Sequence, residues 1–231
     1  MTDILFYGDP HGDFRPLIRA VDRNPPTAVV LLGDMEAREP LDQALRPVLE
    51  MGVRVHWIPG NHDTDTPGVY DNLYHSGLAA INVHGKIVNI GGIRIGGLGG
   101  VFRGKVWDPN GSKTQVRFLS PGDMLASSAQ RWRNGLPLRH RSTIFPDAYQ
   151  GLLGQRADVL ITHEAPECHR HGSPVIGRLA GCLYARLIVH GHHHVDYEDT
   201  LYGGIDVRGV GLRSLYRLNV ETFKSRHGLD L

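Results

Sequence analysis

Residues 53–63 read VRVHWIPGNHD, a short apolar run that ends in a proline–glycine pair and then in polar side chains. The run has the length and the β-branched content of a buried strand. Asn61, His62 and Asp63 follow it directly. The stretch therefore predicts a strand of an α/β sheet whose carboxyl end carries side chains suited to metal or substrate binding.

Four other apolar runs have the same form. They cover residues 4–7, 28–32, 159–161 and 187–189. Each is followed within two residues by an aspartate or a histidine, and helical patterns such as residues 13–23 and 41–50 lie between runs. Alternating strands and helices predict an α/β fold. Because ligands bind outside the carboxyl ends of strands in such sheets, we expect the five polar strand ends to form one site.

The residues at these strand ends are of the kinds that bind transition metals. They are Asp9, His11, Asp34, Asn61, His163, His192 and His194. Imidazole nitrogen mixed with carboxylate and amide oxygen suits manganese, iron or zinc better than calcium or magnesium. Seven ligands are more than one ion needs, so the sequence predicts two metals about 3.5–4 Å apart. A glycine before the polar residue, as at Gly33 and Gly60, predicts close backbone approach.

The same residues resemble the five motifs of the calcineurin-like metallophosphoesterase superfamily. The motifs are Asp9-x-His11, Gly33-Asp34, Gly60-Asn61-His62-Asp63, His163 and Gly191-His192-x-His194. The resemblance implies a four-layer αββα sandwich of two mixed β-sheets flanked by helices, in a single domain over residues 1–231. It also implies a metal-dependent phosphoric ester hydrolase.

The resemblance further implies a role for each motif residue. The first metal would take Asp9, His11, Asp34 and His194, and the second Asp34, Asn61, His163 and His192. Asp34 would bridge the two ions, and a bridging hydroxide would attack phosphorus. His62 is expected to face the leaving oxygen as general acid or charge stabiliser, and Asp63 to orient its ring. We expect two divalent transition metals, with Mn²⁺ first and iron, zinc or nickel as alternatives.

Arg38 lies four residues after Asp34, where protein phosphatases and diadenosine tetraphosphatases of the superfamily carry an arginine. We expect it to bind substrate phosphate through its bidentate fork, with a solvated arginine as the alternative. The third motif of those relatives ends in glutamate, and this chain departs from it at Asp63.

The chain between the third and fourth apolar runs has a different pattern. Residues 81–83, 86–90 and 93–98 predict short strands joined by tight turns, which would help to build the second sheet. Residues 201–220 predict more antiparallel strands. Residues 101–146 are rich in glycine, proline and serine, and they predict a functional loop or cap.

This insertion is strongly basic. It holds Arg103, Lys105, Lys113, Arg117, Arg131, Arg133, Arg139 and Arg141. Eight basic residues against two aspartates give a local charge of +6, on a chain whose net charge is +1. Interleaved Trp107, Phe118 and Trp132 favour a surface that binds nucleic acid, with a solvated loop anchored by its aromatics as the alternative. Arg103 joins Arg38 and Asn61 as a candidate substrate-binding residue.

We therefore expect a dimetal phosphodiesterase that acts on a nucleotide or nucleic acid. Within the enzyme class, the alternatives are a phosphomonoesterase of the protein phosphatase type and a dinucleoside polyphosphate hydrolase. From other classes, the alternatives are a catalytically inactive binding module and a metal-handling protein that uses Cys168, His169 and His171. Two cysteines, no signal segment and no long apolar run predict a cytoplasmic protein without a membrane partner. The oligomeric state is left open.

Overall fold

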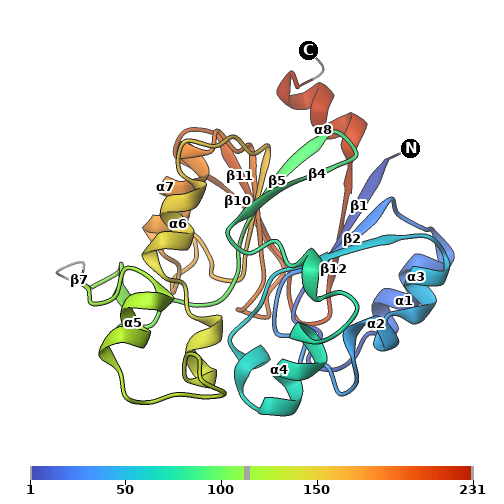
Figure 1. Cartoon of the computed structure of the whole chain (residues 1–231). Helices are drawn as coiled ribbons and strands as arrows, with labels where there is room; N and C mark the ends of the chain where they lie inside the picture. The colour runs from blue at the N-terminus through green and yellow to red at the C-terminus, as the bar shows by residue number, and fades with distance from the viewer. Residues whose placement is uncertain (1, 112–114, 230–231) are drawn as a thin grey trace.

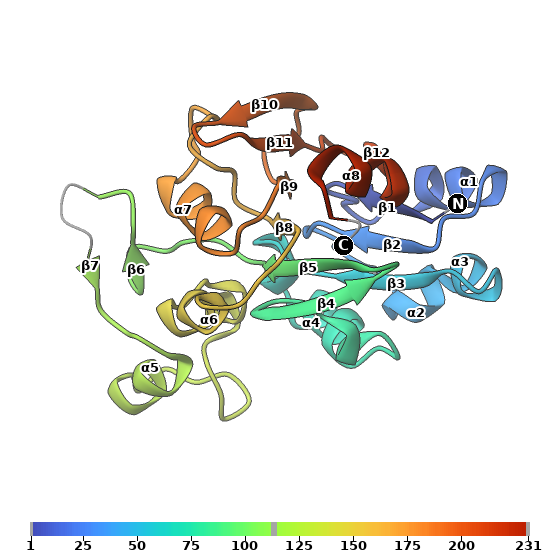
Figure 2. The same cartoon turned by 90° about the horizontal axis from the view of Figure 1, so that it is seen from above.

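Two β-sheets pack face to face at the centre of the molecule, and helices cover their outer faces (Figures 1 and 2). The computed structural model describes residues 2–111 and 115–229. One hydrophobic cluster fills the space between the sheets, where Phe6 and Val30 face Val159 and Val189. Two further clusters lie under the helices on either side. The predicted four-layer α/β sandwich is confirmed.

The first sheet has four strands in the order β12-β1-β2-β3. Their bounds are β1 (Asp3–Tyr7), β2 (Ala28–Leu31), β3 (Arg54–Trp57) and β12 (Leu215–Asn219). β1, β2 and β3 run parallel, whereas β12 pairs antiparallel with β1. The helices on its outer face are α1 (Arg15–Arg23), α2 (Leu41–Ala44) and α3 (Arg46–Glu50). The carboxyl ends of the three parallel strands therefore share one edge.

The second sheet has six strands in the order β10-β11-β9-β8-β5-β4. Their bounds are β4 (Lys86–Ile90), β5 (Ile93–Leu98), β8 (Val159–Thr162), β9 (Leu187–His190), β10 (Tyr197–Leu201) and β11 (Ile205–Gly209). β5, β8, β9 and β11 run parallel. α6 (Pro146–Leu152) and α7 (Pro174–Cys182) cover the outer face. The predicted hairpin, β4 and β5, belongs to this sheet as expected.

Two local expectations were wrong. The predicted helix over residues 41–50 is broken at Leu45, because Pro47 has no N–H to continue the hydrogen-bond ladder. The predicted strand at 81–83 is only an isolated bridge between Asn82 and Trp57, after α4 (Pro67–Tyr74) and a 3-10 helix (Ala79–Ile81). The antiparallel strands predicted over 201–220 are present, with β11 paired to β10 in the second sheet and β12 paired to β1 in the first. α8 (Val220–His227) follows β12.

The insertion leaves and rejoins the fold at neighbouring points. Val101 and Thr143 form a bridge, and it encloses β6 (Trp107–Asp108), β7 (Gln115–Val116) and α5 (Pro121–Ser127). A 3-10 helix (Leu138–Ser142) ends the segment. In Figure 1 the segment extends from the lower part of the molecule, away from the sheets. Lys113 lies outside the described residues.

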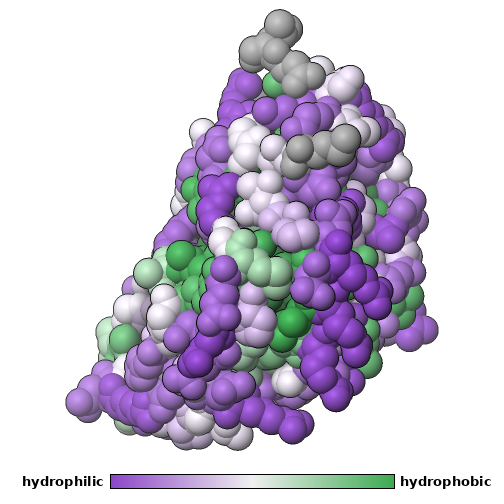
Figure 3. Space-filling view, turned by 90° about the vertical axis from the view of Figure 1, so that its right-hand side faces the viewer, coloured by the Kyte–Doolittle hydropathy of each residue, from purple (hydrophilic) through white to green (hydrophobic). Residues whose placement is uncertain are grey.

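The face that carries the N-terminal helices is mostly hydrophilic, with an apolar area near its middle (Figure 3). Within the described ranges, every helix is too short or too polar to cross a membrane.

Candidate metal centre

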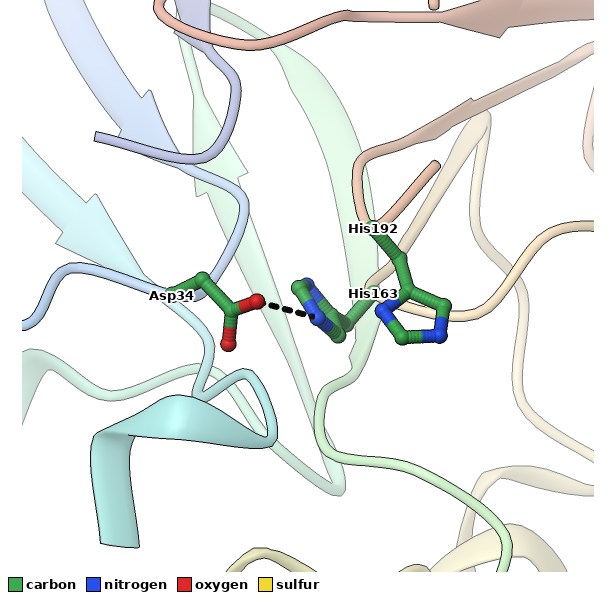
Figure 4. A group of neighbouring side chains, drawn as sticks. All are labelled: Asp34, His163 and His192. Carbon is green, nitrogen blue, oxygen red and sulfur yellow. Dashed lines mark ion pairs between the residues drawn. The ribbon is translucent and has the colours of Figure 1, made fainter. Parts of the chain in front are cut away.

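The structure brings the predicted ligands of the second metal together. Nε2 of His163 lies 3.4 Å from Oδ2 of Asp34 and 3.2 Å from Oδ1 of Asn61. His192 completes the group, since one ligand atom each of Asp34, His163 and His192 lies within 4.8 Å of the others. Figure 4 shows these three side chains pointing toward one another from the loops after β2, β8 and β9. Three separate strand ends therefore supply one cluster.

The predicted ligands of the first metal lie beside this group. The backbone N–H of His192 donates to both carboxylate oxygens of Asp9, at 3.0 and 2.9 Å. Nε2 of His11 lies 3.1 Å from Nε2 of His194. Asp9 lies 3.9 Å from the His163 ring, so the two groups are continuous. All five predicted strand ends converge.

The orientation of His163 suits a metal ligand. Its Nδ1 lies 2.8 Å from the carbonyl oxygen of Leu32, which only accepts, so Nδ1 carries the proton and Nε2 faces Asn61 and Asp34. His163 is fully buried. Although burial disfavours the charged ring, the carboxylates of Asp34 and Asp9 raise the pKa of His163 to about 10. Buried carboxylates that face the Nε2 edge of an imidazole ring fit a divalent cation. The cation would take the place of the second proton, the one on Nε2.

The backbone at the centre is unusual. Five of the seven predicted ligands adopt positive φ values, namely Asp9 (40°), His11 (42°), Asp34 (50°), His192 (74°) and His194 (58°). Such conformations cost energy in residues other than glycine and gather at functional sites. They turn the chain sharply after each strand and aim the side chains inward. Residue identity gives no sign of this strain, so the sequence could not reveal it.

Two glycines allow the strand ends to come close. A Cβ atom on Gly60 would lie 2.2 Å from Oδ1 of Asp34, and one on Gly33 would lie 2.4 Å from Nδ1 of His163. Gly33 also has φ of 100°. The predicted close backbone approach is confirmed at both positions.

His62 contacts the centre and two acidic side chains that the motif analysis missed. Its backbone N–H donates to Oδ1 of Asp34 at 2.8 Å. Its Nδ1 lies 2.6 Å from Oδ2 of Asp65 and 3.7 Å from Oε1 of Glu36. The other oxygen of Glu36 lies 3.2 Å from Nδ1 of His11. The i, i+3 spacing of His62 and Asp65 at the 3-10 helix His62–Thr64 was the available signal.

The prediction that Asp63 orients the His62 ring is wrong. The Asp63 carboxylate is fully buried and accepts backbone N–H groups of Gly60 (2.8 Å) and Glu36 (3.1 Å). Burial, with the nearby charge of Asp34, raises the pKa of Asp63 to about 7. The Asp63 carboxylate therefore links the loop after β2, through Glu36, to the loop after β3, through Gly60.

The two candidate arginines differ in their surroundings. Arg103 is partly buried, with Nη2 3.3 Å from Oγ of Ser142. Burial and the neighbouring Arg139 lower the pKa of Arg103, while the charges of Asp65, Glu164 and Asp34 oppose that shift. Arg38 is exposed and lies over Gly12, where a Cβ atom would meet its Nε at 3.3 Å.

An αββα sandwich with imidazole, carboxylate and amide donors at its strand ends is the arrangement of a metal-dependent phosphoesterase. The family model for calcineurin-like phosphoesterases matches residues 2–196. The chain therefore belongs to the calcineurin-like phosphoesterase family and is a metal-dependent phosphoric ester hydrolase. An uncharacterized protein of Haemophilus influenzae is 38% identical over 216 residues, which cover 92% of each chain.

Solved structures share the fold at low sequence identity. TT1561 of Thermus thermophilus has a TM-score of 0.58 and 17% identity, and the match covers 95% of this chain and 99% of that one. A dimetal phosphatase from Danio rerio has a TM-score of 0.58 and 12% identity, with 94% and 91% covered. Phosphopantetheinyl hydrolase of Mycobacterium tuberculosis has a TM-score of 0.51 and 17% identity, with 97% and 92% covered. These likenesses support the fold assignment.

Proposed function

We propose that this chain is a two-metal phosphodiesterase whose substrate is a small nucleotide. The observation that carries the proposal is the position of the Asp34 carboxylate, with Oδ2 facing the His163 ring and Oδ1 receiving the N–H of His62. Asp34 would be shared between the ions. Asp9, His11 and His194 would complete one site, and Asn61, His163 and His192 the other. When bound, two divalent cations supply Lewis acidity to the phosphate oxygens and to the attacking water.

His62 is the proposed general acid for the leaving oxygen. Asp65 and Glu36 lie against its Nδ1, so that nitrogen carries a proton, and the opposite nitrogen, Nε2, has no hydrogen-bond partner among the described residues and can face the substrate. Although burial opposes it, the hydrogen bond that Nδ1 donates to Asp65 and the negative charges around the ring raise the pKa of His62, which favours the protonated form that an acid needs.

Arg103, Asn61 and Arg38 are the proposed phosphate-binding residues. Arg103 contributes a partly desolvated cation from the insertion, whose attraction to phosphate is less screened than that of an exposed arginine. Its contact with Ser142 holds the side chain beside the loop of His62, because Ser142 also contacts Oγ1 of Thr64 at 2.7 Å.

The surroundings of the insertion's aromatic residues favour a nucleotide over a nucleic-acid strand. Trp107 is 6% exposed and packs against Phe102 and Tyr149, with ring centroids 5.0 and 5.5 Å away. Trp132 packs against Tyr70 and lies under the guanidinium of Arg133. Bases stack on free aromatic faces. Trp107 and Trp132 instead pack against neighbouring side chains and so hold the insertion to the fold.

The deciding assay compares bis-para-nitrophenyl phosphate with para-nitrophenyl phosphate in the presence of Mn²⁺. We expect a higher kcat/KM for the diester, and loss of both metal and activity in Asp34→Asn. A tenfold preference for the monoester would replace the proposal with a phosphomonoesterase. Absence of hydrolysis by metal-loaded protein on mono- and diesters and on dinucleoside polyphosphates would indicate an inactive binding module.

A second assay addresses the size of the substrate. Binding to a nucleic-acid strand releases counterions and weakens steeply as salt rises. We expect single-stranded oligonucleotides to be cleaved more slowly than mononucleotide diesters, with little dependence on ionic strength. Rapid oligonucleotide cleavage that falls steeply with salt would favour the nucleic-acid alternative.

A further inference from the structure

One acidic side chain lies between a proposed ligand of the first metal and the proposed general acid. Oε2 of Glu36 lies 3.2 Å from Nδ1 of His11, and Oε1 of Glu36 lies 3.7 Å from Nδ1 of His62. The two rings are neighbours, with centroids 5.6 Å apart. The two oxygens of one carboxylate therefore each lie at ion-pair distance from a different imidazole of the site.

The orientation of His11 gives its contact with Glu36 a chemical meaning. Nε2 of His11 faces Nε2 of His194 at 3.1 Å, and both residues are proposed ligands of the first metal. A metal binds the lone pair of a neutral imidazole, so a ligating Nε2 carries no proton. The proton of His11 then resides on Nδ1, the atom that lies against Glu36. Ligand histidines commonly direct this second nitrogen toward a carboxylate, which fixes the ring and its tautomer.

The backbone of Glu36 is held in a conformation that calls for a reason. Its φ is 43°, which a glutamate adopts only at a cost in energy, and such residues gather at functional sites. The N–H of Glu36 donates to Oδ1 of the buried Asp63 at 3.1 Å. The N–H of His11 donates to the carbonyl oxygen of Asp34 at 2.9 Å, which joins the loop of Glu36 to the loop of His11. This anchored turn presents the Glu36 carboxylate to both rings.

Glu36 has a task that Asp65 does not share. Asp65 lies 2.6 Å from Nδ1 of His62 and is the nearer partner of that ring. Among the described residues, however, Glu36 is the only acidic side chain at ion-pair distance from His11. Glu36 is therefore the carboxylate that joins His11 to His62.

We propose that Glu36 is a positioning residue for both histidines. It fixes His11 with Nε2 toward the first metal, and it keeps the His62 ring at a set distance from His11. The inference rests on the two-metal site proposed above. A negative charge 3–4 Å from two N–H groups attracts both of them, and the attraction is stronger where protein partly excludes water. Metal binding through His11 and the orientation of His62 thus depend on one side chain.

Calorimetric titration of the metal-free, full-length protein with Mn²⁺ tests the effect on His11. We expect two sites in the wild type, and Glu36→Ala should weaken one of them about 10- to 100-fold, the usual effect of removing the partner of a ligand histidine. Glu36→Gln keeps an oxygen that can accept the Nδ1 proton, so its loss should be smaller. The control is Glu39→Ala, which removes the same charge from an exposed position in the same loop. Wild-type affinity at both sites in the two Glu36 variants would overturn the proposal.

Steady-state kinetics at saturating Mn²⁺ test the effect on His62. With both sites filled, Glu36→Ala should lower kcat about fivefold or more and leave KM within about twofold, because the general acid is displaced while the proposed phosphate-binding residues are unchanged. A kcat restored to the wild-type value by excess metal would overturn the link to His62.

The calorimetric readout separates this inference from the proposed activity. Loss of metal affinity at one site in Glu36→Ala, with wild-type affinity in Glu39→Ala, supports the role of Glu36 even if diesters are not hydrolysed. Diester hydrolysis by a Glu36→Ala protein with wild-type metal affinity and wild-type kcat would reject the role of Glu36 and leave the proposed activity in place.

Discussion

Nδ1 of His62 lies 2.6 Å from Oδ2 of Asp65, and this contact, three residues along the chain, holds the ring of the proposed general acid. The adjacent Asp63 is buried beneath the turn and bonds only to backbone N–H groups in the described structure. The two aspartates therefore have separate tasks. Asp65 sets the ring orientation and proton position of His62, while Asp63 holds the loops after β2 and β3.

Replacing Asp65 should impair turnover without removing metal. We expect Asp65→Ala to lower kcat about 10- to 100-fold, because a carboxylate partner of an active-site histidine typically has an effect of that size. Asp65→Asn keeps an oxygen that accepts the Nδ1 proton and should retain more activity. Steady-state kinetics and metal content are the measurements, with exposed Asp22→Ala in α1 as the control. Wild-type kcat in Asp65→Ala would reject the contact as functional.

Arg103 should contribute mainly to substrate binding. A charge-assisted hydrogen bond is worth about 1.5–3 kcal/mol, so Arg103→Ala should raise KM about tenfold or more while metal content stays constant. Exposed Arg117→Ala, in the same basic segment, removes equal charge away from these contacts. Equal effects of the two substitutions would show that only the net charge of the segment matters.

Arg38 is tested in the same way. Arg38→Ala is expected to weaken substrate binding far more than metal binding, because its guanidinium lies over Gly12, next to the proposed ligand His11. Competitive inhibition by inorganic phosphate gives the binding constant directly. Unchanged kinetics and unchanged phosphate inhibition would leave Arg38 as a solvated side chain.

Gly60 is expected to tolerate no side chain. A Cβ atom there would lie 2.2 Å from Oδ1 and 2.3 Å from the backbone nitrogen of Asp34, so Gly60→Ala must displace the central carboxylate. We expect at least tenfold weaker metal binding, measured by calorimetry. Gly181→Ala in α7 is the control, since nothing lies within 4 Å of its Cβ position and alanine should stabilise the helix by about 0.5–1 kcal/mol. Normal metal affinity in Gly60→Ala would contradict the close approach.

His84 should make stability fall in mild acid. Burial lowers the pKa of His84 to about 4, below the ordinary value of 6.5. As the pH falls from 6.5 to 4, the unfolded chain therefore takes up a proton before the folded chain does, and the free energy of unfolding decreases by at most about 1.4 kcal/mol per pH unit. Urea unfolding at several pH values should show a shallower decrease for His84→Gln. Parallel plots of unfolding free energy against pH for the two proteins would show that His84 is not the cause of the decrease.

The convergence of the strand ends could be predicted from the sequence because each apolar run leads directly into a proposed ligand, and parallel strands bring such ends to one edge. Side-chain partners were harder to predict. Asp63 was the neighbour of His62 in sequence, but the 3-10 turn placed Asp65 against the ring. The ligand backbone conformations were equally hidden, since positive φ at Asp9 or Asp34 depends on how the loops pack.

Long-range pairing was the other gap. Periodicity indicated strands after residue 200 but not that β12 would return to pair with β1, because the partner lies more than 200 residues away in the chain. For the basic and aromatic residues of the insertion, the sequence left open a nucleic-acid surface and a solvated loop anchored by its aromatics, and the buried Trp107 agrees with the second. Composition reports charge and ring content, and only the fold shows which rings are covered. The cytoplasmic location stays a prediction.

The bridge between Val101 and Thr143 has a consequence for changing the length of the insertion. The bridge holds both ends of the insertion together. Oγ of Ser142 also hydrogen-bonds Oγ1 of Thr64, beside the His62 turn. Residues 104–137 can therefore be lengthened or shortened while Arg103, Ser142 and the loop of His62 keep their contacts. Changes within residues 104–137 are therefore a direct route to altered substrate selectivity.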